Sequence, residues 1–286
     1  MCLQPTSIVS TVAALAFAAT ASAHDFWLQP ATFRPLAGSA VGIDLKVGHA
    51  GDMTTLPRNE KRLVKFVVRD GDGERPVPGA EGVAPAGLIR LPREGLAVVG
   101  YESNHSRSEL DPLKFEGYLR EVGLERIAEE RAKRGATNVV EPEIFMRCPK
   151  ALLVAQPAAA TPGTAIPASG APADASKPAP IVDRALGLRL ELIAGANAAS
   201  VKPGESLPFT LLYEGKPIGD VLVVVKDMVA GTEAARARSA ADGTLSLTFP
   251  HAGRWLVTCV HMVKAPEGKD AVWESIWASS TIEVVG

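Results

Sequence analysis

Residues 244–260, TLSLTFPHAGRWLVTCV, contain two apolar stretches joined by a short segment with proline and glycine. Residues 244–249 alternate polar and apolar side chains, which is typical of a half-buried β-strand, and residues 255–260 form a second apolar run. Asp242-Gly243, just before them, is a hairpin signal. The stretch therefore predicts two strands with a turn at 250–253.

The same pattern continues in both directions, from residue 184 to the end of the chain. Short alternating or apolar runs, separated by turns that contain glycine and proline, indicate about seven strands in roughly 100 residues, the size of an immunoglobulin- or prealbumin-like sandwich. Besides the two strands already named, the clearest runs are 186–192, 207–213, 221–225 and 280–285.

The first half of the chain has a similar pattern, with expected strands at 41–47, 63–70 and 96–101. A helical pair follows near 111–134. Asp111-Pro112 is a typical helix start, and Gly123 and Gly135 are typical helix ends. We expect a mainly β protein with two β-sandwich domains, the C-terminal one immunoglobulin- or prealbumin-like, and a short helical pair between them.

Two further segments set the expected boundaries. Residues 1–23 contain an apolar run followed by Ala21-Ser22-Ala23, which predicts a cleavable export signal and a periplasmic protein. From residue 155 to 180, 10 of 26 residues are Ala and 6 are Pro, so that stretch lacks side chains to bury. The expected domains are therefore 24–150 and 184–286, with a linker or surface insertion at 151–183.

Composition excludes several classes of function. The chain has 30 basic and 32 acidic residues, so no global charge attracts nucleic acid or an anionic membrane. No run after the signal is long and apolar enough to span a bilayer. The sequence has no nucleophile elbow, zinc-protease helix or phosphate loop, and nothing in it supports nucleophilic catalysis.

The cysteines of the chain allow one possible disulfide. Cys2 belongs to the expected signal, which leaves Cys148 and Cys259 in the mature chain. An even pair in an oxidising compartment can form a disulfide, although spacing alone does not show that the two sulfur atoms meet.

Cleavage after Ala23 would make His24 the first residue of the mature chain. Its α-amine and imidazole can chelate one metal ion, and an α-amine with a pKa near ~8 loses its proton to a metal at neutral pH. One or two further imidazoles would complete a nitrogen set that suits Cu(II) or Ni(II). The alternative is an ordinary cleavage site followed by a frayed terminus.

His49 and His261 follow predicted strands, where side chains can reach a binding site. His105 lies in a polar loop and His251 in a turn. A lone histidine is more often structural than a metal ligand, so these residues gain weight only together with His24. Glu274, and Asp25 beside His24, are the candidates for carboxylates that orient ligand histidines.

The mature start, residues 24–30 (HDFWLQP), and the pairs Gly48-His49 and His261-Met262 resemble the NikM-like periplasmic family, a domain-of-unknown-function family once described as a nickel-uptake component. Trp273-Glu274-Ser275 is similar as well, whereas residues 144–150 depart from the family pattern. The resemblance implies export, two β-rich domains and an association with transition metals, and its matching histidines are His24, His49 and His261.

These observations favour a periplasmic binding protein for Ni, Co or Cu that serves metal uptake or homeostasis, with a membrane permease or outer-membrane receptor as partner. His24, His49 and His261 would be the ligands, and a carrier is favoured over an enzyme. Two alternatives remain: a copper-dependent oxidative enzyme built on the same histidines, and an envelope binding or structural module without metal.

Overall fold

β-Strands dominate the computed structural model, which describes residues 24–49, 51–158 and 182–286. This part of the chain contains 17 strands and two helices, which confirms the expected mainly β class. The expected signal, 1–23, and most of the expected linker lie outside the described residues.

The first half contains nine strands and both helices. They are β1 (Asp25–Pro30), β2 (Ala40–His49), β3 (Asp52–Leu56), β4 (Leu63–Asp70), β5 (Gly73–Pro76), β6 (Gly87–Arg90), β7 (Gly95–Ser103), β8 (Ser106–Ser108), α1 (Pro112–Glu121), α2 (Glu125–Lys133) and β9 (Glu143–Ala155). The second half adds β10 (Leu190–Ala194), β11 (Ser206–Tyr213), β12 (Lys216–Pro217), β13 (Leu222–Asp227), β14 (Glu233–Arg238), β15 (Thr244–Thr248), β16 (Gly253–Lys264) and β17 (Trp273–Val284).

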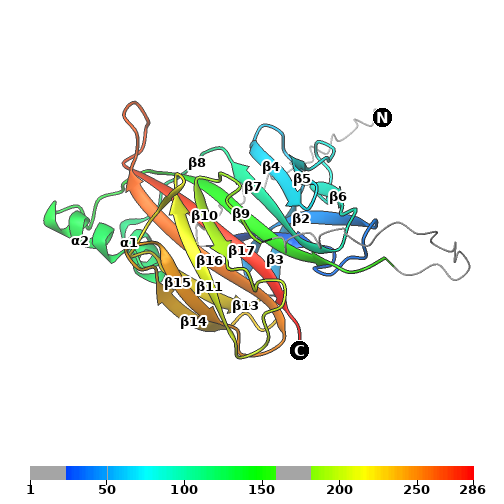
Figure 1. Cartoon of the computed structure of the whole chain (residues 1–286). Coiled ribbons are helices and arrows are strands. Elements are labelled where there is room, and N and C mark those ends of the chain that lie inside the picture. Colours follow the sequence, from blue (N-terminus) through cyan, green and yellow to red (C-terminus); the bar gives the residue numbers. More distant parts are fainter. Residues whose placement is uncertain (1–23, 50, 159–181) are drawn as a thin grey trace, which may run out of the picture.

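Both halves contribute to one central sheet of nine strands, in the order β14-β13-β16-β17-β9-β7-β4-β5, with β8 paired to β9 (Figure 1). The halves join where β9 pairs in parallel with β17, from Trp273 opposite Glu143 to Thr281 opposite Ala151. A four-stranded N-terminal sheet contains β1, β2, β3 and β6, and a four-stranded C-terminal sheet contains β10, β11, β12 and β15. The two sandwiches therefore share their middle layer.

Side chains alternate between the two faces of the central sheet. On β17, Ile276 and Ala278 belong to the large core under the C-terminal sheet, and we call this side the C-face. Ser279 and Thr281 point the other way and donate hydrogen bonds to the carbonyl groups of Phe26 and Leu28 in β1. We call this second side the N-face.

The N-face has two covers. The N-terminal sheet packs over the part formed by β4, β7 and β9, through a second core that includes Leu28, Ile43 and Val99. The helices cover the other end, where Leu119 and Ile127 pack with Met262 of β16. The described structure thus has three β-layers over part of its extent, with the helical pair beside the N-terminal layer.

The helix boundaries follow from local chemistry. The Asp111 side chain accepts a hydrogen bond from the Leu113 backbone and caps α1, with Pro112 in its first turn. Gly123 adopts a φ of 75° after that helix, a conformation that favours glycine. The helical pair predicted at 111–134 is confirmed.

Residues 151–155 were predicted to belong to the linker but form the end of strand β9. Asp183, at the other end of the predicted linker, is buried against Lys150. Only the stretch between them, largely outside the described residues, is left as a connection between β9 and the second half.

Cys148 and Cys259 are both buried and free, so the suggested disulfide is not formed. Both lie opposite Ala278, Cys148 on one neighbouring strand and Cys259 on the other. Two strand spacings separate them, about 10 Å, whereas a disulfide requires Cα atoms within about 7 Å. The thiols are core groups, and burial raises the pKa of Cys148 to about 12.

Candidate functional site

His24 and His49 lie side by side, with ring centroids 5.0 Å apart. The pairing of β1 with β2 explains this, because Asp25 stands opposite Gly48, His24 immediately precedes Asp25 and His49 immediately follows Gly48. Gly48 has a φ of 134°, and a Cβ there would lie 2.2 Å from the Asp52 carbonyl oxygen. Glycine therefore allows the close return of β3 that leaves His49 at the end of its strand.

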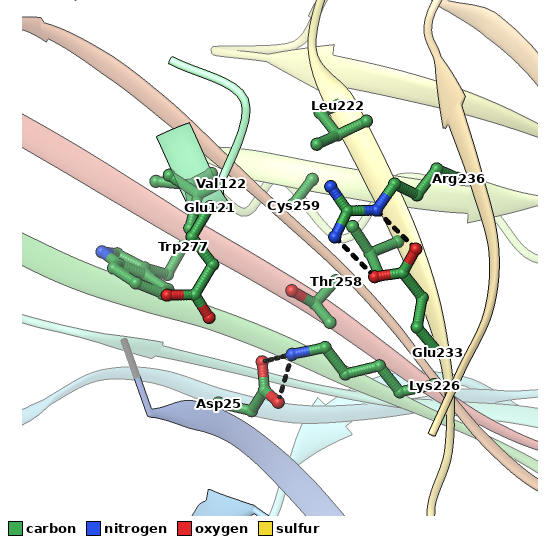
Figure 2. A pocket seen from close by; sticks show the side chains of 12 residues that line it. Asp25, Glu121, Val122, Leu222, Lys226, Glu233, Arg236, Thr258, Cys259 and Trp277 are labelled. Carbon is green, nitrogen blue, oxygen red and sulfur yellow. Dashed lines mark hydrogen bonds and ion pairs between the residues drawn. The ribbon is translucent and has the colours of Figure 1, made fainter. Parts of the chain in front are cut away.

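Asp25 connects this pair of histidines to the second half of the chain. Its buried carboxylate accepts hydrogen bonds from Lys226 Nζ at 2.7 and 3.0 Å (Figure 2). His49 Nδ1 lies 3.8 Å from the same carboxylate. Because Lys226 is on β13 of the central sheet, this contact fixes the start of β1 against the N-face.

Two connected depressions border Asp25. One, of about 240 Å³, is lined by His49, Trp27, Lys226 and Met228. The other, of about 60 Å³, lies between the end of α1 and strands β13 and β14, where the Glu121 side chain extends toward Thr258 and Lys226 (Figure 2). Since the His49 side chain is 45% exposed, the histidine pair is accessible from solvent.

Arg147 contacts the backbone of His24. Its guanidinium donates a hydrogen bond to the His24 carbonyl oxygen at 3.3 Å and lies over the Trp277 ring, 4.3 Å from the centroid. Phe145 is also close, at 5.1 Å. Burial lowers the pKa of Arg147 to about 10, and the guanidinium forms no ion pair with the described carboxylates. Sequence analysis did not single out this residue.

A buried carboxyl lies behind Arg147. Glu143 accepts hydrogen bonds from the hydroxyls of Ser275 and Tyr118, the latter at 3.3 Å, and Tyr118 stacks on Trp277 at 5.5 Å between centroids. Burial raises the pKa of Glu143 to about 7, despite the opposing hydrogen bonds and the charge of Arg147. A charged residue at the start of a long apolar run was the sequence signal for this group.

His261 does not join His24 and His49. It stands opposite Ile276 and alternates with Cys259, so its side chain is on the C-face, whereas β1 lies across the N-face. Its ring packs against Tyr213 of β11, with centroids 4.7 Å apart. Burial, followed by the charges of Arg126 and Arg189, lowers the pKa of His261 to about 4. The imidazole is therefore neutral at physiological pH.

Glu274 is also on the C-face and has partners other than the expected ligand histidines. Its carboxylate, 1% exposed, accepts hydrogen bonds from both terminal nitrogens of Arg189, one of them at 2.8 Å. His105 Nε2 lies 2.5 Å from the same carboxylate. Glu274 thus fastens the loop with His105 and the start of the C-terminal sheet to β17.

The structure therefore brings together two of the three histidines expected to bind metal. In residues 24–49, 51–158 and 182–286, no group of three or more His, Cys, Asp or Glu side chains is arranged to hold a metal ion. Any site at His24 and His49 needs a further donor, and the α-amine that cleavage before His24 would release is one candidate.

The family model described as "Domain of unknown function (DUF4198)" matches residues 21–263. The chain belongs to this family. No curated protein matches the chain. Among solved structures, the dimeric latent PorU of Porphyromonas gingivalis is similar at 13% identity, over 89% of this chain and 20% of that chain, with a TM-score of 0.17. This chain thus spans about a fifth of the PorU chain.

The DUF4198 match includes both His24 and His49, and it carries no established activity. In the described part of the chain, neither helix has the length and apolar character needed to cross a membrane.

Proposed function

We propose that this DUF4198 protein binds a transition-metal ion, Cu, Ni or Co, through His24 and His49, and serves metal uptake or homeostasis in the periplasm. The observation that supports the proposal is the 5.0 Å separation of the two rings. A metal–nitrogen bond of about 2 Å puts each ring centroid about 3.2 Å from the ion, so two rings on one ion lie roughly 4.5–6.4 Å apart. The separation between His24 and His49 is within this range.

The third nitrogen would come from the α-amine of His24 after removal of residues 1–23. An amine and an imidazole on one residue form a small chelate ring, and His49 adds a second imidazole from the neighbouring strand. Three nitrogens around an ion leave an open position, which suits the tetragonal preferences of Cu(II) and Ni(II). The metal is the cargo in this proposal.

The surroundings of the histidines favour reversible binding. His49 is 45% exposed and borders a cavity of about 240 Å³, so an ion and its receiving partner have access. Asp25, 3.8 Å from His49 Nδ1, is near enough to favour a proton on that nitrogen and leave the other free to bind. A membrane permease or outer-membrane receptor would take up the released ion.

Electron paramagnetic resonance of Cu(II)-loaded mature protein, with its N-terminus at His24 verified by mass spectrometry, tests the proposal. We expect one Cu(II) per chain and hyperfine lines from three nitrogens. His49→Ala should lose one nitrogen and at least tenfold in affinity, and an added alanine before His24 should have a similar effect.

His261→Ala is the matched control, because this histidine lies within β16 and its side chain is on the other face of the central sheet. Its spectrum and Cu(II) affinity should equal those of the wild type. Unchanged binding in both His49→Ala and the alanine-extended chain would contradict the proposal.

A further inference from the structure

A third cavity, of about 390 Å³, lies between the N-terminal sheet and the central sheet. Its apolar walls come from four strands and include Phe26 of β1, Leu45 and Val47 of β2, Leu56 of β3 and Phe145 of β9. Sites for small molecules have volumes of about 300–1,000 Å³ and combine such walls with a few polar groups. The cavity therefore has the size and lining of a binding site.

Two arginines border this cavity, and none of its lining residues is acidic. Arg62 is positioned by the Ser106 hydroxyl at 2.8 Å and the His105 carbonyl at 3.1 Å. Arg147 is positioned by the His24 carbonyl and by the Trp277 ring. All these acceptors are uncharged, and neither guanidinium forms an ion pair with a described residue. The cavity thus carries positive charge that no lining residue neutralises, although the carboxyl groups of Glu143 and Asp25, outside its lining, also act on Arg147.

Tyr101 adds an unused hydrogen-bond donor. It is 4% exposed and lines the cavity, and its ring packs edge-on against Phe66, with centroids 5.5 Å apart. Its hydroxyl makes no hydrogen bond with the described part of the chain. A hydroxyl that lines the cavity without a partner in the described chain is available to a molecule inside the cavity.

We propose that this cavity binds a small organic anion, specifically a monocarboxylate with an aromatic or branched apolar body. Arginine recognises carboxylates through two parallel hydrogen bonds, and both Arg147 and Arg62 have nitrogens left for this purpose. The apolar body would pack against Phe26, Phe145 and the N-terminal sheet, and the Tyr101 hydroxyl would donate a further hydrogen bond. A carboxylate can form charge-assisted hydrogen bonds with the half-buried Arg147 and the exposed Arg62, whereas a neutral ligand cannot, which favours the anion.

Isothermal titration calorimetry on mature protein freed of metal by a chelator tests this inference apart from the proposed metal site. The probes are benzoate, phenylacetate and 4-methylpentanoate, with benzamide as the neutral counterpart of benzoate. We expect at least one carboxylate to bind with one molecule per chain, and benzoate to bind at least tenfold more tightly than benzamide.

Variants assign the binding to the cavity. Tyr101→Phe should keep the wild-type melting temperature, because the hydroxyl has no partner within the described structure, and should weaken carboxylate binding several-fold. Arg147→Gln should weaken it at least tenfold. Arg254→Gln is the control, since Arg254 also stacks on an aromatic ring, Phe33 at 5.8 Å, but lies outside the cavity.

Two results would overturn the inference. One is that none of the three carboxylates binds the wild-type protein, or that benzoate and benzamide bind equally. The other is that carboxylate affinity is unchanged in the folded Tyr101→Phe protein.

Discussion

Two cations of β9, one on each face of the central sheet, have different partners. On the C-face, Lys150 is fully buried and donates hydrogen bonds to Asp183 at 2.7 Å, to Glu191 at 3.1 Å and to the Leu192 carbonyl. On the N-face, Arg147 has a carbonyl group and aromatic rings around it and no carboxylate partner among the described residues. Both residues are on β9, three positions apart.

This difference separates groups that hold the fold from groups that can bind something else. Charges in an interior are stable only with partners, and the C-face provides those partners from the chain itself. The N-face leaves Arg147, Tyr101 and the His24–His49 pair facing cavities or solvent. We therefore expect loss of a paired charge on the C-face to affect stability first, and substitution of the unpaired groups on the N-face to affect ligand binding.

The largest effect is expected for Lys150→Met. It leaves the carboxylates of Asp183 and Glu191 buried without their cation, which should lower the free energy of unfolding by about 3–5 kcal/mol. Lys226→Met is the matched N-face variant, and its partly exposed pair with Asp25 should cost about 1 kcal/mol or less. Urea unfolding at pH 7 measures both. Equal losses of unfolding free energy in the two variants would contradict the difference that we infer between the two faces.

Glu143→Gln should have the next largest effect, and it should depend on pH. The pKa of Glu143 is about 7 in the folded protein, above the usual 4.5. Between these pH values the folded protein therefore binds more protons than the unfolded protein, and its stability falls as the pH rises from 4.5 to 7. Glutamine cannot ionise, so at pH 8 the variant should be more stable than the wild type by about 2 kcal/mol.

Melting temperatures from pH 4.5 to 8 check this expectation, with Glu267→Gln on an exposed loop as the control. The wild type and the control should show the same pH slope, and Glu143→Gln a flatter one. If the melting temperature of Glu143→Gln depends on pH as steeply as that of the wild type, another group causes this dependence.

His261→Gln should show a smaller effect of opposite sign. The pKa of His261 is about 4 in the folded protein, below the usual 6.5. Between these pH values the folded protein binds fewer protons than the unfolded protein, so the stability of the wild type falls as the pH drops from 6.5 to 4. The variant should lose less stability on acidification. Its melting temperatures at pH 4.5 and pH 7 measure this, and His251→Gln in the exposed turn serves as the comparison.

The smallest effect is expected for Asp25→Asn. Loss of the carboxylate near His49 should weaken Cu(II) binding by about threefold, below the usual range for groups that orient a ligand, because the 3.8 Å contact is long and Lys226 shares the carboxylate. Competition with a chelator of known affinity measures the change. A hundredfold loss would instead indicate that Asp25 binds the ion directly.

Alternation and turn residues were sufficient to predict nine of the 17 strands in the described part of the chain, and the missed ones include several strands of two to five residues. β9 was missed because its apolar residues are nearly continuous and it contains Pro149, as suits a strand buried on both faces inside a mixed sheet. β1 was missed because residues 24–30 were interpreted only for their possible chemistry. The shared sheet could not be predicted, since local patterns do not show which distant strands pair.

The histidines show the same limit. Sequence position predicted that His49 and His261 lie at strand exits. His49 is the last residue of β2, but His261 lies within β16, which continues to Lys264. The sequence also did not show which side of the sheet each side chain would occupy. Neighbouring residues on a strand point to opposite faces, and Val260 and Met262, on either side of His261, pack with the helices on the N-face. A shift of one residue would have reversed the side on which His261 lies.

The position of β17 affects how the chain can fold. This last strand pairs with β16 on one side and β9 on the other, so it lies inside the sheet and not at its margin. In a polypeptide that is synthesised from its N-terminus, β17 emerges after both of its neighbours. Until then β9 and β16 have nothing between them, so closure of the central layer depends on a late pairing with a strand far along the chain from β9.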